Sequence, residues 1–502
     1  MKKLGFMLLL AMAMVFASCK DESSTDMLSM IPADVDYVGS VNVGSIIEKA
    51  GIKVENGQVT FPDSYSAVVE KGMGSNDMQM LGQLAQSGFD FDGKVYMFGD
   101  KSAKGVFIVP VKDAGATKTF LESSTGKTLV ADGDMFKIEK LMGRGSAAYL
   151  TGNSLVVVAN YMGDDVDSYL KGVIAGGGET SIKDNADAMA ILNHEGDMAM
   201  YGDYKNILAM GGAKVITEMY GAEYAGFLDA YRGIGYTLDF GKKEVELYCK
   251  MFYDENNEII KQSLKAVGKP SAEGLKFIPA DMQLVFSGSI NGEEMVKNEL
   301  LGSLLDKVFT PQVSRIITKD EAMEYLGSID GPLTLGWNYV DYITSREREV
   351  QVYGAIKTDK ADDLCKKIQS TVTAEGQGFI ACSKVGSEYV VNLLGSQVFA
   401  FGSKDGFFHF RSMPQQVKES MYDNDIARGI FEKTPSGLYA NLLKDSRANN
   451  MIVSIMPRMQ FSAYAKVEMD DMSSGTLKLV IEEPEGNNSL ETILAVIAGA
   501  MN

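Results

Sequence analysis

Hydrophobic residues recur along the chain at two spacings. Val245, Leu247, Cys249 and Met251 occupy alternate positions, which is typical of a strand with one apolar side. In 361–372, apolar residues recur three or four positions apart, which is typical of an amphipathic helix. Strand-like runs outnumber helical ones, and many are joined by short turns without regular strand–helix alternation. The pattern predicts an α+β fold, mainly antiparallel sheet with a few covering helices.

The motif Ile31-Pro32-Ala33-Asp34 occurs again as Ile278-Pro279-Ala280-Asp281. Proline fixes a turn in each copy, and an extended apolar run follows. After the first run, Ser45-Ile46-Ile47-Glu48 matches a capping box, in which serine and glutamate satisfy free amides at a helix start. After the second run, Asn291-Gly292-Glu293-Glu294 predicts a capped helix. The motif is therefore interpreted as the opening of a repeated unit.

A second recurring feature closes each copy. Asn256-Asn257 and Asn487-Asn488 each follow a predicted hairpin and precede an apolar helix that runs to a glycine. The polar stretch 269–274 contains proline and glycine and separates the copies. Two similar tandem domains are predicted, residues 27–268 and residues 275–502, joined by the linker 269–274.

The N-terminus has the features of a secretory signal. Lys2 and Lys3 precede a short apolar run, and Ala17-Ser18-Cys19 ends it like a bacterial lipobox. We expect a signal peptide over residues 1–18 and lipidation of Cys19, because acyl chains on this cysteine would anchor the mature protein stably. The alternative is a plain secreted protein. Lys20, Asp21 and Glu22, within a polar tether over 19–26, resemble an acidic export signal to the cell surface. The alternative to surface display is the periplasmic face of the outer membrane.

The charge balance limits the class of partner. The chain has 502 residues and a formal net charge of −19, which becomes −21 when Lys2 and Lys3 leave with the signal peptide. An acidic protein is repelled by phosphate backbones and anionic lipid headgroups. Nucleic acid is therefore excluded as a partner, and membrane attachment is expected to be covalent.

The sequence contains no recognisable catalytic constellation. His194 and His409, the two histidines, share no metal-binding spacing and are interpreted as structural. Cys249 is predicted to be a buried apolar residue, and Cys365 and Cys382 are predicted to be two free buried thiols or, less favoured, a disulfide. Clustered acids at 164–167 are interpreted as a solvated face or helix start. No cofactor, metal or catalytic residue is assigned.

Aromatic residues near loops are the candidate binding residues. They are Trp337, Tyr339 and Tyr342 in the second copy, and Tyr220 and Tyr224 in a longer segment of the first. Exposed aromatic rings stack on sugars or anchor protein partners. The alternative is that Leu333, Leu335, Trp337 and Tyr339 alternate on a core-facing strand.

Through the lipobox Cys19, the Pro-Ala-Asp openings and the Asn-Asn helix starts, the chain resembles predicted Bacteroidetes outer-membrane lipoproteins with a large duplicated domain of unknown function. The resemblance implies location and architecture but no activity. We expect a non-catalytic binding protein at the outer membrane or cell surface, with a protein, glycan or apolar ligand. The alternative is an envelope hydrolase that uses acidic residues.

Overall fold

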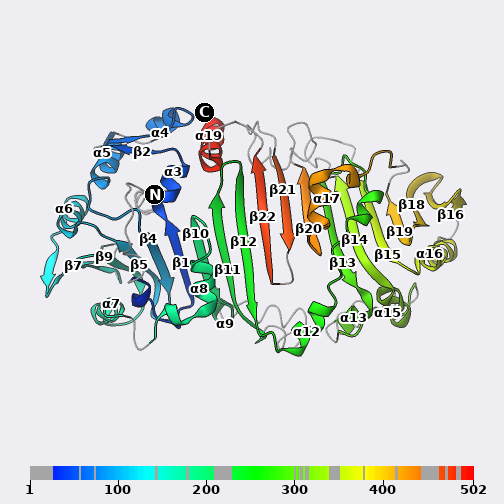
Figure 1. The fold of residues 1–502 in the computed structure, drawn as a ribbon, viewed down its shortest axis with the longest axis horizontal. Helices are drawn as coiled ribbons and strands as arrows, with labels where there is room; N and C mark the ends of the chain where they lie inside the picture. Colours follow the sequence, from blue (N-terminus) through cyan, green and yellow to red (C-terminus); the bar gives the residue numbers. More distant parts are fainter. Residues whose placement is uncertain are drawn as a thin grey trace. The chain divides into compact units, whose positions relative to one another are not determined.

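The computed structural model describes residues 27–501 apart from a set of internal gaps (Figure 1). The gaps are 56–57, 73–74, 142–144, 177–179, 208–228, 299–300, 303–304, 306–308, 311–315, 339–350, 377–378, 413–416, 442–462, 470–472 and 482–487. The described residues form two compact units. Unit 1 draws on 1–212, 232–252 and 483–502, and unit 2 draws on 213–231 and 253–482.

Unit 1 combines strands with short helices and contains the last helix of the chain; β11 and β12 each extend one residue beyond it. Its elements are η1 Leu28–Met30, β1 Tyr37–Asn42, α3 Val43–Lys49, β2 Lys53–Glu55, β3 Gln58–Thr60, α4 Ser66–Gly72, α5 Ser75–Leu84, β4 Lys94–Gly99, β5 Ala103–Pro110, α6 Ala114–Thr125, β6 Val130–Asp132, β7 Met135–Glu139, β8 Ala147–Leu150, β9 Ser154–Tyr161, α7 Val166–Ile174, η2 Ile182–Asp184, α8 Ala186–Leu192, β10 Met198–Asp203, α9 Tyr204–Ile207, β11 Tyr231–Phe240, β12 Glu244–Tyr253 and α19 Ser489–Met501.

Unit 2 has elements of the same kinds in a similar order. They are α12 Glu258–Lys265, η4 Glu273–Phe277, β13 Leu284–Asn291, α13 Gly292–Met295, α15 Lys319–Gly327, β14 Ile329–Asn338, β15 Gln351–Thr358, α16 Ala361–Glu375, β16 Ile380–Val385, β17 Glu388–Leu393, β18 Ser396–Lys404, β19 Phe407–Arg411, η6 Met421–Asp423, α17 Asp425–Phe431, β20 Ser436–Asn441, β21 Ala463–Met469 and β22 Ser474–Ile481.

The sheet of each unit is antiparallel in every described pairing of its strands. In unit 1, β1 lies between β4 and β10, β10 continues to β11, and β4 continues through β5, β9, β8 and β7 to β6. In unit 2, β13 lies between β14 and β20, β20 continues through β21 to β22, and β14 continues through β15, β19, β18 and β17 to β16. The predicted α+β class with mainly antiparallel sheet is confirmed.

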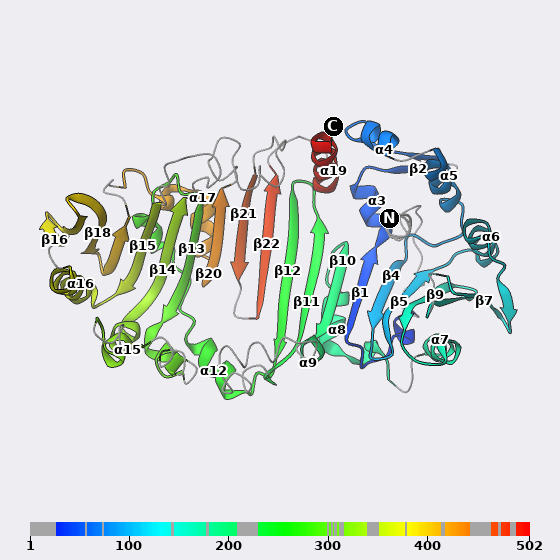
Figure 2. The same ribbon diagram turned by 180° about the vertical axis from the view of Figure 1, so that it is seen from behind.

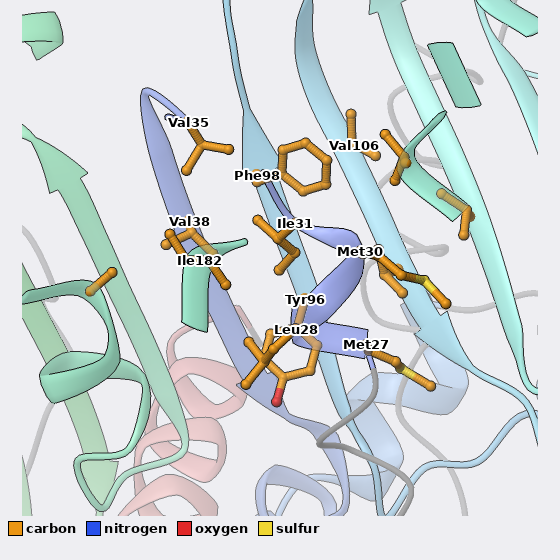
Figure 3. Packing of buried hydrophobic residues seen from close by; sticks show 14 of the residues in the cluster. Met27, Leu28, Met30, Ile31, Val35, Val38, Tyr96, Phe98, Val106 and Ile182 are labelled. Carbon is orange, nitrogen blue, oxygen red and sulfur yellow. The ribbon is translucent and has the colours of Figure 1, made fainter. Parts of the chain in front are cut away.

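The main core of unit 1 lies on one side of β1, β4 and β5. Ile31, Val38 and Phe98 are fully buried there and lie close together (Figure 3). The backbone amide of Ile182 in η2 donates to the carbonyl oxygen of Ile31 at 2.8 Å, and Pro32 forms an isolated bridge with Ser181. The Ile-Pro-Ala-Asp motif therefore joins the start of unit 1 to η2, about 150 residues later in the chain.

Unit 2 repeats this connection at its own motif. The amide of Met421 in η6 donates to the carbonyl oxygen of Ile278 at 2.7 Å, and Pro279 bridges Ser420. Ile278 and Met421 are buried in one core with Phe431 of α17. The helices α8 and α17 pack on the strands β10 and β20 of their own units, and Figures 1 and 2 show these strands from two sides.

The predicted cap at Ser45 is wrong, and the predicted asparagine caps at Asn257, Asn291 and Asn488 form. In α3 the cap is Asn42, whose side chain accepts from the amide of Ser45 at 3.2 Å. Ser45 lies inside the helix, and its hydroxyl donates to Asp197 Oδ1 at 2.5 Å, so the capping box does not form. The Ser45 hydroxyl is therefore bonded to the buried carboxylate of Asp197, which is distant in sequence, and not to the backbone at the helix start. In α13 the predicted Asn291 cap forms with the amide of Glu294 at 3.3 Å.

None of the described helices is both long and apolar enough to cross a bilayer. The strands β8 and β9, and likewise β18 and β19, form antiparallel hairpins with short turns. The predicted repeat boundaries, 27–268 and 275–502, stay a prediction, and the compact units divide the chain differently because α19 lies in unit 1.

The central place of Phe98 gives a stability prediction. Phe98→Ala should lower the free energy of unfolding of unit 1 by about 3–5 kcal/mol, because it removes a fully buried ring and leaves a cavity. The loss is measured by hydrogen exchange of the β1 and β4 amides in increasing urea. Phe379→Ala, at a ring 64% exposed in unit 2, is the matched control and should change little. Equal effects of the two variants would contradict the assigned core.

Candidate functional site

Most residues singled out from the sequence lie outside the described part of the chain. Trp337 is described and lies on β14. Outside the described residues lie the lipidation and export residues and four tyrosines: Cys19, Lys20, Asp21, Glu22, Tyr220, Tyr224, Tyr339 and Tyr342. The candidate site therefore comprises Trp337 and exposed apolar residues of the two sheets that the sequence did not mark as binding residues.

Trp337 lies on the side of its sheet that faces away from the core around Ile278. Thr334 and Gly336, on the other side of β14, face that core: Thr334 is buried, and a Cβ on Gly336 would lie 2.5 Å from Ile278. Neighbouring side chains in a strand point to opposite faces, so Trp337 points away from Ile278. It is half-buried, with Leu284 and Val352 as its cross-strand partners.

An apolar surface surrounds Trp337, which we call the tryptophan face. Cross-strand partners share one side of a sheet, and the registers place these residues together: Leu284, Phe286, Leu335, Trp337, Leu438, Val467 and Leu477. All seven are partly or well exposed. Phe286 is 36% exposed and Leu477 is 38% exposed, so this side is not a closed core.

Unit 1 has an apolar surface on the corresponding strands, which we call the methionine face. Met200 of β10 is paired with Gly39 of β1 and with Tyr236 of β11, and Met97 of β4 is also paired with Gly39. A Cβ on Gly39 would lie 2.9 Å from Met97 Cε, so this glycine leaves room for the methionine. The face comprises Met97, Met198, Met200, Ile234, Tyr236, Leu238, Leu247, Cys249 and Met251.

The exposed part of the methionine face lies over β10 and β11. Met198, Met200 and Tyr236 are 37%, 43% and 38% exposed. The intervening residues Ala199 and Tyr201 are buried in the core on the other side. An antiparallel sheet with one free side normally presents polar residues there. Here both sides of β10 are apolar, and a contiguous exposed apolar surface of this kind marks an interaction site.

Cys249 corrects one prediction from the sequence. It was expected to be buried, but it is half-buried on the methionine face and hydrogen-bonded to Tyr236. Partial burial raises the pKa of its thiol. The alternation along 245–251 correctly identified a strand with one apolar side. It did not show that this side is the open one, because the opposite side of β12 also carries the buried Phe252.

Within the part of the chain that the structure describes, the most buried charged group is Asp197, whose side chain is fully buried. Its carboxylate receives hydrogen bonds from the Ser45 hydroxyl, from the Phe240 amide at 2.7 Å and from Lys49 Nζ at 2.9 Å. Lys49 also pairs with Asp239 at 2.7 Å. Hydrogen bonds to both carboxylates outweigh desolvation and raise the pKa of Lys49. This fully partnered group connects α3 to β10 and β11 and is structural.

Of the carboxyl groups in the described ranges, that of Asp92 has a raised pKa. Burial, with a smaller effect from Asp90, raises the pKa of Asp92. The two residues lie in one turn, where the Asp92 amide donates to Asp90 Oδ1 at 3.2 Å. They do not face each other across a cleft as a hydrolytic pair would. Among the clustered acids, Asp165 caps α7 by accepting from the amides of Asp167 and Ser168, which confirms the helix-start interpretation.

The histidines and the other thiols have packing contacts. His194 stacks on Tyr248 with ring centroids 4.4 Å apart, and His409 stacks on Phe277 at 5.1 Å. Cys365 and Cys382 are free thiols; Cys365 is buried as expected, whereas Cys382 is only half-buried, which corrects the expectation of a buried thiol there. Among the described residues no group of three or more His, Cys, Asp or Glu side chains is arranged to hold a metal ion.

Comparison with known proteins identifies the family. The profile of a domain of unknown function (DUF4836) matches residues 28–448. The chain belongs to this family. The match agrees with the coarser part of the resemblance noted from the sequence, a large domain of unknown function. No curated protein matches the chain.

Three crystal structures of TP0453 are weakly similar to this chain. Crystal form IV is 10% identical, covers 44% of this chain and 79% of that one, and has a TM-score of 0.28. Crystal forms III and I are 13% and 11% identical, each covers 49% of this chain and 87% of that one, and their TM-scores are 0.27 and 0.28. These scores are too low to carry an argument about fold or function.

The half-buried imidazole of His409 gives a prediction of pH dependence. Burial lowers its pKa below the ordinary 6.5, against the opposing effect of Glu388, whose Oε1 lies 3.9 Å from Nδ1. The unfolded chain therefore takes up this proton first as the pH falls. The free energy of unfolding of unit 2 should decrease as the pH falls from about 7.5 to about 5.5. Urea unfolding followed by fluorescence of Trp337, the single tryptophan, measures it.

His409→Gln should make this pH dependence weaker. His194→Gln, at the other histidine of the chain, lies in unit 1 and is the control that should retain it. A slope that His409→Gln leaves unchanged would show that other groups cause it.

Proposed function

We propose that this protein is a non-catalytic, lipid-anchored binding protein of the outer membrane that holds a protein partner on its open apolar sheet faces. The observation that carries the proposal is the methionine face, where Met198, Met200 and Tyr236 are exposed beside one another on paired strands. Burying such a surface against a partner is favourable at about 25 cal/mol per Å² of apolar area.

The shape and composition of the face favour a polypeptide over a small molecule. Small ligands are usually enclosed in concave pockets, whereas adjacent strands form a broad surface. Methionine side chains are flexible and polarisable, and they are frequent on surfaces that accept varied helical partners. Tyr236 adds an aromatic ring of the kind that anchors protein interfaces.

The charge of the chain indicates the chemistry of the partner. A formal net charge of −19 attracts basic groups and repels acidic ones. The partner that fits is therefore a protein segment with an apolar face and basic flanks, such as a basic amphipathic helix. A glycan or a lipid would use the same apolar face with less benefit from the charge.

An internal duplication would give the protein two such faces. Its support is the recurrence of strand pairings, of the Ile-Pro bridge to a 3-10 helix and of the asparagine caps in both units. The tryptophan face lies on the strands of unit 2 that correspond to those of the methionine face. Two sites on one chain raise the apparent affinity for a partner that presents two matching segments.

The hydrolase alternative has weaker support. Asp92 is a carboxyl with a raised pKa, but its neighbour Asp90 lies in the same turn rather than opposite it. A binding role therefore accounts for more of the observed features.

The methionine face can be tested with a defined probe. An amphipathic peptide of leucine and lysine at helical spacing should bind the wild-type chain, and Met200→Lys should weaken binding about tenfold by placing a charge within the face. Titration calorimetry measures the affinity.

The matched control is Met162→Lys, at a methionine that is 59% exposed but lies in the loop after β9. It should bind like the wild type. A scrambled peptide of the same composition should bind weakly. Equal binding of the scrambled peptide, or of Met200→Lys, would reject the site. Binding of neutral phosphatidylcholine vesicles in place of the peptide would reject a protein partner.

The anchor is tested in cells. Cys19→Ala should move the protein from the membrane fraction to the soluble fraction, because no cysteine would then accept the acyl chains. Immunoblots of fractionated cells measure the distribution, and retention of the variant in membranes would reject lipidation of Cys19. External protease should degrade the wild-type protein on intact cells, whereas complete protection until lysis would place it on the periplasmic side.

A further inference from the structure

The last helix of the chain, α19, is attached to the hairpin formed by β11 and β12. The Ser489 amide at its start donates to the carbonyl oxygen of Gly241 at 3.0 Å, and Asn488 Nδ2 donates to that of Phe240 at 2.9 Å. Figures 1 and 2 both show α19 at the end of this hairpin. The helix is thus bonded to the turn of a hairpin more than 240 residues earlier in the chain.

A second set of contacts fixes α19 beside α3 and α4. Ser64, before α4, donates to Glu491 Oε1 at 3.1 Å. Gly51, after α3, has a φ of +73°, and a Cβ there would lie 2.9 Å from Glu491 Oε2, so glycine is needed both for the backbone and for the space. Ser489 and Thr492 of α19 are buried. The site in unit 1 is therefore shaped to this helix.

In unit 2 the corresponding position beside α13 is filled by α12. The Asn291 amide donates to the carbonyl oxygen of Ala266 at 2.9 Å, and Asn298 Nδ2 donates to Ser263 Oγ at 3.1 Å. Both α12 and α19 begin at an asparagine whose side chain accepts from the helix amides. By chain order, however, α12 follows the hairpin of unit 1. The β11–β12 hairpin is therefore followed in the chain by α12 but is hydrogen-bonded to α19.

We propose that α19 is the positioning helix of the methionine face, so that the end of the chain completes the binding surface of unit 1. The hairpin that α19 holds carries Tyr236, Leu238 and Leu247 of that face. The carbonyl groups of Phe240 and Gly241, in the turn of this hairpin, accept the hydrogen bonds from α19. These bonds fix the position of the turn and thereby the ends of β11 and β12. The inference deepens the proposed function and rests on it for its role in binding, but the positioning itself is tested without a ligand.

Two asparagine substitutions separate positioning from helix capping. Asn488→Ala removes the cap of α19 and the bond to Phe240, whereas Asn257→Ala removes only the equivalent cap of α12. We expect hydrogen exchange of the β11–β12 amides in the full chain to become at least about threefold faster in Asn488→Ala and to stay unchanged in Asn257→Ala. No change in either variant, or an equal change in both, would overturn the proposal.

A disulfide test decides the docking even if Asn488→Ala folds poorly. In the full chain, Ser64→Cys with Glu491→Cys should cross-link within one molecule when glutathione disulfide is added, because the two side chains are in contact. Ser64→Cys with Asp167→Cys, at an acid in the first turn of α7 in the same unit, is the matched control and should not. Mass spectrometry identifies the bonds. Cross-linking of the control pair instead, or of neither pair, would overturn the docking of α19.

The leucine–lysine peptide then distinguishes the two proposals. Weaker peptide binding by Asn488→Ala, with Asn257→Ala unaffected, supports the link between α19 and the face. If the wild-type chain binds no peptide while Asn488→Ala still speeds hairpin exchange, the proposed function fails and the positioning role stands. If Asn488→Ala speeds exchange but binds the peptide as the wild type does, the link to binding is overturned.

Discussion

The structure depends on how the Ile-Pro motif is bonded to a 3-10 helix distant in sequence. The carbonyl of Ile31 accepts from Ile182, and that of Ile278 accepts from Met421. Each bond places a short buried segment against one side of the sheet. Proline cannot donate a hydrogen bond of its own, so the preceding carbonyl makes the connection. The side chains around it, such as Phe98 in unit 1 and Phe431 in unit 2, then pack into a closed core.

The opposite side of each sheet is covered only in part: Val95 and Leu121 lie in a second buried core of unit 1, and Phe401 and Phe408 lie in a second buried core of unit 2. In soluble antiparallel sheets, the uncovered side is normally polar. Here Met200 and Tyr236 in unit 1 and Phe286 in unit 2 lie exposed among other apolar residues. A surface of this kind lowers solubility unless something covers it, and the acidic surface of the chain counteracts self-association. Apolar faces on an acidic molecule therefore fit a basic amphipathic partner better than a second copy of the chain.

The buried carboxylate of Asp197 has a structural role and is not a sign of a catalytic site. Asp197 is the most deeply buried carboxylate described above, yet hydrogen bonds from Ser45, Lys49 and the Phe240 amide satisfy it. The same residues join α3 to the end of β11, near the point where α19 is attached through Phe240. Polar groups thus fix the geometry of the hairpin, and apolar groups form the surface that it presents.

The sequence alone determined the local structure. Alternation identified the strands, asparagine identified the starts of α12, α13 and α19, and each Ile-Pro-Ala-Asp motif proved to be bonded to a 3-10 helix. These signals are local, because hydrogen bonds within a turn and the period of a strand depend on near neighbours. Tertiary structure decided the rest. It placed Ser45 on Asp197 instead of at a helix start, turned Cys249 and Trp337 to the open sides of their sheets, and brought α19 to unit 1. The period of a strand shows that two sides differ, but only the packing of distant segments decides which side is covered.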